Sequence, residues 1–184
     1  MSRWVFVRHG QSVANSEGWL SGHVDTPLTE RGWDQARALG EQLAGEDFAR
    51  GYCSDLVRAR QTAEGIGVPV EHTPKLRERF LGAWSRRDRA TLRASGEMRQ
   101  LLSWDGRPGG GESLSDLAAR AMPWLASLEP VGGATLIVSH GGLIRVVLGL
   151  LDGLPREQIG RGRIHNCVPQ VREVVQAHFQ ELCP

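Results

Sequence analysis

The 184-residue sequence lacks a long apolar run, an excess of one charge and a paired set of cysteines. No apolar run approaches the roughly 20 residues that cross a bilayer. The N-terminus has no signal-peptide pattern, so we expect a soluble protein that is not exported. The 22 basic and 21 acidic residues give a net charge of +1, which excludes the overall positive field typical of nucleic-acid-binding proteins. Any attraction for anions must therefore be local.

Cysteine is scarce as well. Cys53, Cys167 and Cys183 are odd in number and have neither metal-ligand nor redox spacing. We therefore expect free thiols in a reducing compartment, with the cytoplasm as the default location. A chain of this length fits one domain, residues 1–184, that is large enough to bury a core.

The stretch 5–12 organises the rest of the sequence. Its apolar start predicts a buried strand, and Gly10 lets the backbone turn into a loop directly afterwards. Arg8 and His9 then lie at the carboxyl end of the strand, where ligands bind in open α/β sheets. An always-charged guanidinium beside a titratable imidazole suggests chemistry on an anion. The alternative is a basic pair that only faces solvent.

A second stretch repeats this arrangement. Residues 134–138 predict another buried strand, which ends in Ser139, His140 and two glycines before an apolar helical pattern. If the two strands are adjacent in a parallel sheet, His9 and His140 meet at one edge. The pair favours a catalytic role over a structural helix-start histidine.

An arginine near the start of a predicted helix is electrostatically unusual. Residues 51–54 predict a strand that leads into a helix capped by Ser54 or Asp55, and Arg58 lies in the first turn. Helix N-termini favour anions, so an arginine there is unfavourable unless both share an anionic ligand. We expect a functional role for Arg58 and a solvated position for Arg60.

Other patterns indicate the remaining elements. Thr29 is a plausible N-cap of a helix that packs on the sheet, and Ser113 with Asp116 resembles a capping box that opens a helix to about residue 128. Residues 11–23 are rich in Gly, Ser and Asn and predict a polar loop. Further strands are expected at residues 68–72, 164–168 and 171–175.

Residues 75–107 break the alternation of strands and helices with a loop and an arginine-rich helix. They carry nine basic and four acidic residues within a nearly neutral chain. This segment is either a lid that draws an anionic substrate or the solvated face of a helix. Trp84 and Trp104 favour a folded insertion over disorder.

The motifs occur in an order that resembles a known family. They are Arg-His-Gly at 8–10, Asp-Thr-Pro-Leu-Thr at 25–29, Ser-Asp-Leu at 54–56 before Arg58 with Gln-Thr-Ala at 61–63, Leu-Arg-Glu at 76–78 before Gly82 and Trp84, Gly-Gly-Glu-Ser at 110–113, and Ser-His-Gly-Gly at 139–142. Over residues 3 to about 168 the sequence resembles the histidine phosphatase superfamily, in its cofactor-dependent phosphoglycerate mutase-like branch. The resemblance implies an α/β three-layer sandwich, with a mostly parallel mixed central sheet, helices on both faces and a basic, lid-like insertion at about 75–107.

The resemblance also implies a role for each matching residue. His9 would take the phosphoryl group as the nucleophile, and a phosphohistidine splits one difficult displacement into two easier steps. The groups that would hold the phosphoryl oxygens are the side chains of Arg8, Asn15, Arg58 and His140 with the backbone of Gly22 and Gly141. Such a clamp supplies position and positive charge without a metal or another cofactor.

Glu78 would protonate the leaving alcohol and then activate water. The acid role needs a raised pKa, whereas neighbouring arginines lower it. We expect a bound phosphate dianion to raise the pKa of Glu78.

Three other functions fit less well. Residues 10–14 nearly match a serine-hydrolase nucleophile elbow, but Ala14 replaces its second glycine and the His-Gly-Gly segment follows instead of preceding. A metal hydrolase is disfavoured because no pair of the six histidines has helical ligand spacing. A catalytically silent phospho-ligand-binding protein is disfavoured because every catalytic position of the family pattern is filled.

Phosphatase and phosphoglycerate mutase remain as alternatives. The mutases that the sequence resembles are longer, with insertions that keep water from the phosphohistidine. Here Ser85 and Arg86 follow Trp84 where relatives often have Glu-Gly. We predict a phosphatase that hydrolyses a small phosphomonoester. The expected partner is a small phosphorylated metabolite, not nucleic acid or a membrane, and the chain would act as a monomer or homodimer.

Overall fold

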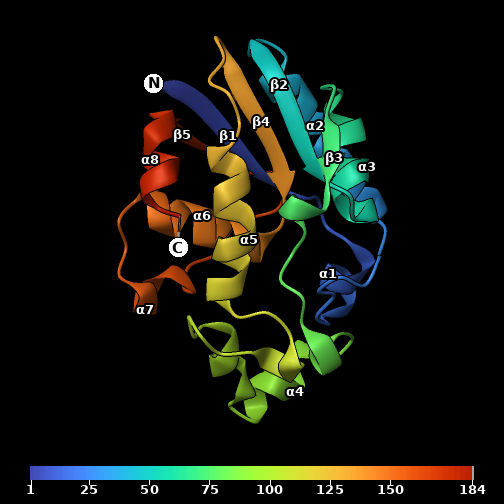
Figure 1. The fold of residues 1–184 in the computed structure, drawn as a ribbon. Coiled ribbons are helices and arrows are strands. Elements are labelled where there is room, and N and C mark those ends of the chain that lie inside the picture. The colour runs from blue at the N-terminus through green and yellow to red at the C-terminus, as the bar shows by residue number, and fades with distance from the viewer. Residues whose placement is uncertain (184) are drawn as a thin grey trace.

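The computed structural model describes residues 1–183. They form a mixed sheet between two layers of helices, and an insertion lies beyond the carboxyl edge of the sheet (Figure 1). The strands are β1 (Ser2–Arg8), β2 (Phe48–Ser54), β3 (Glu71–Thr73), β4 (Ala134–Ser139) and β5 (Gln170–Val174). The helices are α1 (Val13–Glu17), α2 (Glu30–Leu43), α3 (Val57–Ile66), α4 (Arg89–Ala94), α5 (Leu114–Ala126), α6 (Gly141–Leu151), α7 (Arg156–Ile159) and α8 (Gln176–Glu181). The predicted α/β three-layer architecture is confirmed.

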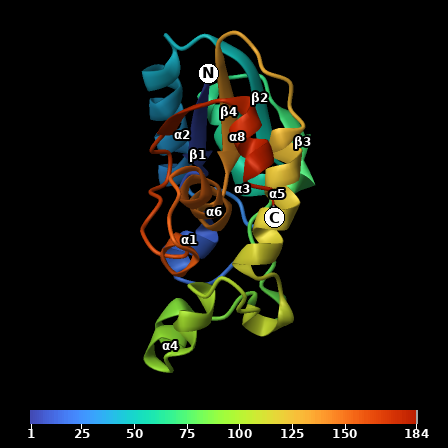
Figure 2. The same cartoon turned by 60° about the vertical axis from the view of Figure 1, so that its left-hand side comes forward.

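The strand order is β3-β2-β4-β1-β5, and only β5 runs antiparallel to its neighbour. Alternate residues of β1 enter opposite cores, as the period of two in a strand requires. Trp4 and Phe6 pack in the core that includes residues of α5, α6 and α8, whereas Val5 and Val7 pack with α2 and α3. Figure 2 shows α2 on one side of the sheet and α5 with α8 on the other.

Two predicted helix starts are confirmed. The Thr29 hydroxyl accepts a hydrogen bond from the Gly32 N–H, and Ser113 with Asp116 forms the predicted capping box. The predicted cap of α3 was wrong: the N-cap is Leu56, which has no side chain able to cap. The Asp55 carboxylate accepts two hydrogen bonds from Arg77 instead, and the Val57 N–H at the start of α3 donates to Asp25.

The strand predicted at 68–72 is confirmed only at 71–72, where β3 begins, and the strand predicted at 164–168 was wrong. The third strand is only β3, because Pro69 has no N–H to donate to a ladder and pairing with β2 begins at Glu71. Residues 164–168 form a turn, in which Cys167 has a φ of 52° and its N–H donates to the Arg8 carbonyl. This turn therefore lies across the carboxyl end of β1. The predicted loop 11–23 contains the short helix α1.

The insertion between β3 and α5 is folded, as its tryptophans predicted. The insertion has a small hydrophobic core, in which Leu20 packs against Leu81, Trp84 and Leu92. Figures 1 and 2 show α4 beyond the carboxyl edge of the sheet, away from both helical layers. Among residues 1–183, no helix combines the length and the apolar character that a membrane crossing requires.

Candidate active site

The register of β1 and β4 brings the two histidines together. Arg8 pairs with Ser139, so the next residues, His9 and His140, leave the sheet side by side. Their ring centroids are 5.1 Å apart and both side chains are buried. The predicted adjacency of the two strands is confirmed.

The His9 ring is held in one tautomer. Its Nδ1 lies 2.7 Å from the Gly10 carbonyl oxygen, which can only accept, so Nδ1 carries the proton. Burial lowers the pKa of His9 well below 6.5, and the charges of Arg58 and Arg8 lower it further. A neutral ring protonated at Nδ1 leaves a lone pair on Nε2, which is the form that a nucleophile needs.

Arg58 is fully buried on the first turn of α3 and is held by backbone carbonyls, not by a carboxylate. It donates to Gly22 O at 2.8 Å and to Val24 O at 3.1 Å. Its Nε has no hydrogen-bond partner among residues 1–183. Burial lowers the pKa of Arg58 to about 10, so it remains charged at neutral pH. In this structure, Gly22 meets Arg58 through its carbonyl oxygen.

Arg8 lies at the end of β1 and is fixed by the turn 164–168. It donates to Ile164 O at 2.7 Å and to Asn15 Oδ1 at 3.4 Å, while its Nε has no partner in the described part of the chain. Burial lowers the pKa of Arg8 to about 10. Asn15 and Gly141 line the same cleft as Arg8.

His140 is the N-cap of α6 and contacts β2. Its Nε2 lies 2.8 Å from the Ser54 hydroxyl, which also accepts a hydrogen bond from the Leu56 N–H. Its Nδ1 is buried without a partner among residues 1–183. Burial lowers the pKa of His140 well below 6.5, and the charge of Arg58 lowers it further. Unpartnered nitrogens of Arg8, Arg58 and His140 are thus available to an anion.

The Glu78 carboxylate is held by two backbone amides. Oε1 accepts from Arg79 N at 2.9 Å and Oε2 accepts from Gly142 N at 3.0 Å. A Cβ at position 142 would overlap Glu78 Oε1, so glycine is required there for this approach. Burial alone would raise the pKa of Glu78, but these amides, with Arg145 and Arg58, lower it below its ordinary value. At neutral pH Glu78 is therefore a carboxylate.

Arg8, Asn15, Glu78 and Gly141 line a cleft of about 510 Å³. Sequence reasoning missed several of the side chains that line it: Arg89, Arg93, Arg145, Arg163 and Asn166. Asn166 Nδ2 donates to the His9 carbonyl at 2.6 Å, within a segment that we predicted to be a strand. The spacing of Arg89 and Arg93, four residues apart on a helix, was the one available signal that they share a face.

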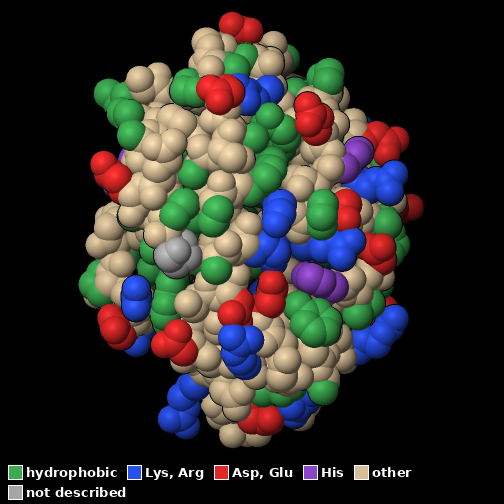
Figure 3. Space-filling view, in the orientation of Figure 1, with side chains coloured by type: hydrophobic (Ala, Val, Ile, Leu, Met, Phe, Trp, Pro, Cys, Tyr) green, Lys and Arg blue, Asp and Glu red, His purple; other side chains and the backbone are tan. Residues whose placement is uncertain are grey.

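The basic segment 75–107 divides its arginines between two environments. Arg89 and Arg93 line the cleft, whereas Arg77, Arg87 and Arg107 form ion pairs with carboxylates outside it. Arg60 is exposed, as predicted. Figure 3 shows Lys, Arg and His side chains gathered near the middle of one face of the molecule. Among residues 1–183, no group of three or more His, Cys, Asp or Glu side chains is arranged to hold a metal ion.

Comparison with known proteins fits this geometry. A model of the histidine phosphatase superfamily (branch 1) matches residues 4–180. The chain belongs to the histidine phosphatase superfamily. Among relatives of this superfamily, a 2,3-bisphosphoglycerate-dependent phosphoglycerate mutase 2 from Gloeobacter violaceus is 37% identical over 92% of this chain and 84% of its own. A probable phosphoglycerate mutase from Photorhabdus laumondii is 37% identical over 91% of this chain and 82% of its own.

Solved structures of phosphatases are similar to this histidine phosphatase superfamily member. A mycobacterial glucosyl-3-phosphoglycerate phosphatase has a TM-score of 0.86 and 32% identity, covering 93% of this chain and 92% of its own. A putative α-ribazole-5′-P phosphatase from Escherichia coli has a TM-score of 0.82 and 32% identity, covering 96% and 92%. The superfamily thus includes both phosphatases and mutases that are similar to this chain.

Proposed function

We propose that this protein is a phosphatase that hydrolyses a small phosphomonoester through a phosphohistidine on His9, without a metal. The observation that carries the proposal is the His9 ring, which is buried, neutral and protonated at Nδ1 against Gly10 O. Its free Nε2 lies among Arg8, Arg58 and His140, whose unpartnered nitrogens can hold phosphoryl oxygens. Phosphoryl transfer needs mainly positioning and positive charge, which these side chains supply.

The reaction takes place in two displacements. His9 Nε2 attacks phosphorus, the bond to the ester oxygen breaks, and the Glu78 carboxyl donates its proton to the leaving alkoxide. Water then attacks phosphorus, Glu78 takes the proton of that water, and the P–N bond breaks to release inorganic phosphate and restore His9. Because the pKa of Glu78 is lowered without ligand, Glu78 must gain a proton as the phosphate dianion binds and raises that pKa.

Labelling of His9 tests this proposal. A rapidly quenched reaction with ³²P-labelled ester should leave acid-labile, alkali-stable label on the protein. The label should be absent from His9→Gln and present in the control His72→Gln, which changes an exposed histidine on β3. Label of undiminished amount in His9→Gln would contradict the proposal.

Mutase activity is a second candidate because the two relatives named above are called phosphoglycerate mutases. We favour hydrolysis because Arg93, Gly162 and Arg163 are exposed and line the same cleft as Glu78, so the cleft beside the proposed general base is open to water. The comparison is 3-phosphoglycerate with catalytic 2,3-bisphosphoglycerate, followed by ³¹P NMR. We expect inorganic phosphate to accumulate faster than 2-phosphoglycerate, and the reverse would identify a mutase.

The substrate in this proposal is a small phosphorylated metabolite, handled by one chain or by a homodimer. The three free cysteines fit action in a reducing compartment such as the cytoplasm.

A further inference from the structure

Three neighbouring strands end side by side at the carboxyl edge of the sheet. β4 lies between β1 and β2 (Figure 1), and the polar side chains at these ends are His9 after β1, His140 after β4 and Ser54 at the end of β2. The function proposed above uses both imidazoles but not Ser54. The side chain of Ser54 is nevertheless fully buried, and its hydroxyl lies 2.8 Å from His140 Nε2.

The proton of the Ser54 hydroxyl has one acceptor within reach. The Leu56 N–H, 3.3 Å from Ser54 Oγ, can only donate to that oxygen. Among residues 1–183 the hydroxyl makes no hydrogen bond other than these two. If His140 Nε2 carried a proton, the Ser54 O–H would be buried without an acceptor, which is a costly state for a donor. The Ser54 O–H therefore donates to His140 Nε2.

This hydrogen bond sets the tautomer of His140. Burial and the charge of Arg58 lower the pKa of His140 well below 6.5, so the ring is neutral at neutral pH. A neutral imidazole that accepts at Nε2 carries its one proton on Nδ1. His140 Nδ1 is buried and has no hydrogen-bond partner in the part of the chain that the structure describes. Because the charges of Arg8 and Arg58 act on the same ring, the acceptor that fits this N–H is an anion.

His9 and His140 thus hold the same tautomer for opposite purposes. The Gly10 carbonyl accepts from His9 Nδ1, which leaves a lone pair on His9 Nε2 to attack phosphorus. The Ser54 hydroxyl donates to His140 Nε2, which leaves the Nδ1–H of that ring to donate to a phosphoryl oxygen. The ring centroids are 5.1 Å apart, so one phosphoryl group can contact both rings. In the other tautomer, the lone pair of His140 Nδ1 would repel the phosphoryl oxygens.

We propose, resting on the phosphatase function above, that Ser54 is a positioning residue that keeps the proton of His140 on Nδ1, so that the ring donates a hydrogen bond to the transferred phosphoryl group. Ser54 acts through the ring and not on the substrate. A donor that is already oriented needs no reorganisation when the phosphoryl group binds. Ser139 does not share this role, because its equally buried hydroxyl donates to Leu76 O at 2.8 Å.

Nitrogen NMR measures the tautomer directly. In protein labelled with ¹⁵N-histidine, long-range ¹H–¹⁵N correlation separates a protonated ring nitrogen from an unprotonated one, and His140→Gln assigns the signals. At neutral pH we expect His140 to be protonated on Nδ1 only. Ser54→Ala should let the proton occupy Nε2, whereas Ser139→Ala, the same change at an equally buried serine, should not.

Two NMR results overturn the proposal. One is a wild-type His140 that is protonated on Nε2, and this result does not depend on whether any Ser54 variant folds. The other is an unchanged tautomer of His140 in folded Ser54→Ala.

The binding of inorganic phosphate measures the effect on the site. Calorimetry should show that Ser54→Ala binds phosphate about 10-fold more weakly than the wild type, which is a typical effect of one hydrogen bond to a charged group. Ser139→Ala should bind phosphate with the affinity of the wild type. Undiminished affinity in Ser54→Ala overturns the proposal. Equal losses in the two variants also overturn it, because a general loosening of the sheet edge would then explain them.

Labelling of His9 separates this proposal from the proposed function. If His9 takes up label from a phosphomonoester but His140 is protonated on Nε2, the function stands and the proposal for Ser54 is wrong. If phosphate binding and the tautomer of His140 both depend on Ser54, yet His9 takes up no label, the proposal for Ser54 stands and the phosphatase function is wrong.

Discussion

The floor of the site (His9, Arg58 and His140) and the arginine wall of the cleft (Arg89, Arg93, Arg145 and Arg163) are both basic, but they are built in different ways. The floor arises where β1, β4 and α3 begin or end, and its side chains are buried and fixed by backbone groups such as Gly10 O and Gly22 O. The wall comes largely from the short helix α4 and a loop, and Arg93 and Arg163 are exposed. We propose that the residues at the edge of the sheet carry out the reaction, whereas α4 and the loop between α7 and β5 contact the rest of the substrate.

The largest expected effect is the loss of activity when Arg58, in the floor of the site, is substituted. Arg58→Lys should lower kcat/KM by about 10³-fold, because an ammonium cannot reach both carbonyls and also present two donors to the phosphoryl group. Steady-state kinetics on p-nitrophenyl phosphate measures the loss. The control is Arg60→Lys, which changes an exposed arginine on the same helix and should retain full activity. A folded Arg58→Lys protein with nearly wild-type kinetics would show that the floor does not depend on this arginine.

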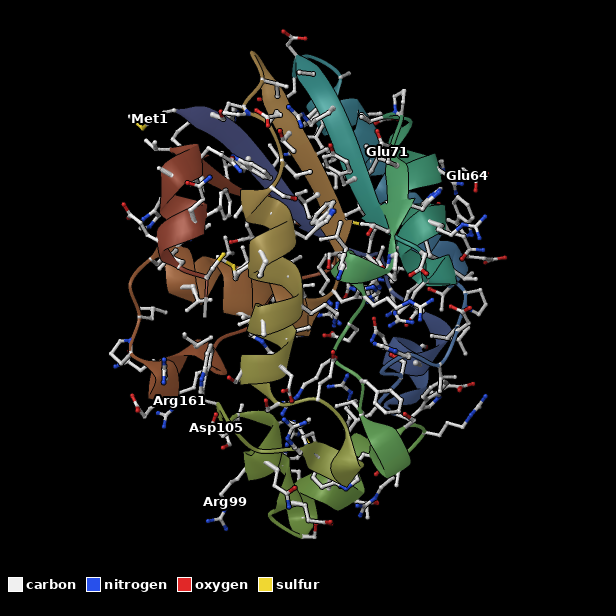
Figure 4. All side chains as sticks on the ribbon, viewed as in Figure 1. Met1, Glu64, Glu71, Arg99, Asp105 and Arg161 are labelled. Atoms are coloured by element: carbon white, nitrogen blue, oxygen red, sulfur yellow. The ribbon has the colours of Figure 1, made fainter. Side chains whose placement is uncertain are left out.

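The effect of Glu78→Gln on activity should depend on how basic the leaving group of the substrate is. General acid catalysis contributes about 10²- to 10⁴-fold, so hydrolysis of an alkyl phosphate should fall by that factor. The loss should be much smaller for p-nitrophenyl phosphate, whose phenolate leaves without a proton. Glu64→Gln, at the exposed side chain on α3 that Figure 4 labels, is the control. Equal losses on both substrates would mean that Glu78 is only structural.

The insertion depends on one buried cation. Arg79 donates to the carbonyls of Leu101, Gly106 and Glu112 and is almost fully buried. Arg79→Met should lower the free energy of unfolding by about 3 kcal/mol, because buried carbonyls lose a charged donor. The matched change Arg107→Met removes an exposed ion pair and should cost less than about 1 kcal/mol. Urea unfolding followed by circular dichroism compares the two variants, and equal costs would contradict this account of the insertion.

The smallest expected effect concerns stability against pH. The pKa values of folded His9 and His140 lie well below 6.5, mainly because of burial, so below pH 6.5 the unfolded chain binds more protons than the native one. The contribution of the two neutral histidines to the free energy of unfolding is therefore fully present well above pH 6.5 and is lost as the pH decreases. Each histidine should lower the free energy of unfolding by about 1 to 2 kcal/mol as the pH is lowered from about 7.5 to about 5.5.

Urea unfolding at both pH values measures this loss. His9→Gln and His140→Gln should each reduce it, whereas His72→Gln, on an exposed histidine, should not. Stability that is constant over this range in the wild type would show that neither ring is held neutral.

The floor could be predicted because its signals are local. Apolar runs that end in Arg-His-Gly and Ser-His-Gly-Gly predict buried strands with histidines at one edge, and β1 pairs with β4 as expected. Arg58 was identifiable because a cation in the first turn of a helix is unfavourable without a ligand.

The wall could not be predicted because it depends on contacts between distant segments. Residues 164–168 were predicted to be a strand from their composition, but tertiary contacts with Arg8 turn this segment over the site. Likewise, charge counting over 75–107 cannot tell Arg93, in the cleft, from Arg87, paired with Glu97. Only the fold distinguishes their partners.

The position of β4 in the sheet has a consequence for biosynthesis. β4 lies between β1 and β2 but is translated after both, and its pairing joins Arg3 to Ala134. Until β4 leaves the ribosome, β1 and β2 have no strand between them to pair with. Their apolar side chains therefore stay exposed to water or to chaperones. His9, the proposed nucleophile, is thus among the first residues made, but the residues around it assemble only when most of the chain has been translated. Contacts between residues so far apart in sequence slow folding, and they prolong the lifetime of aggregation-prone intermediates.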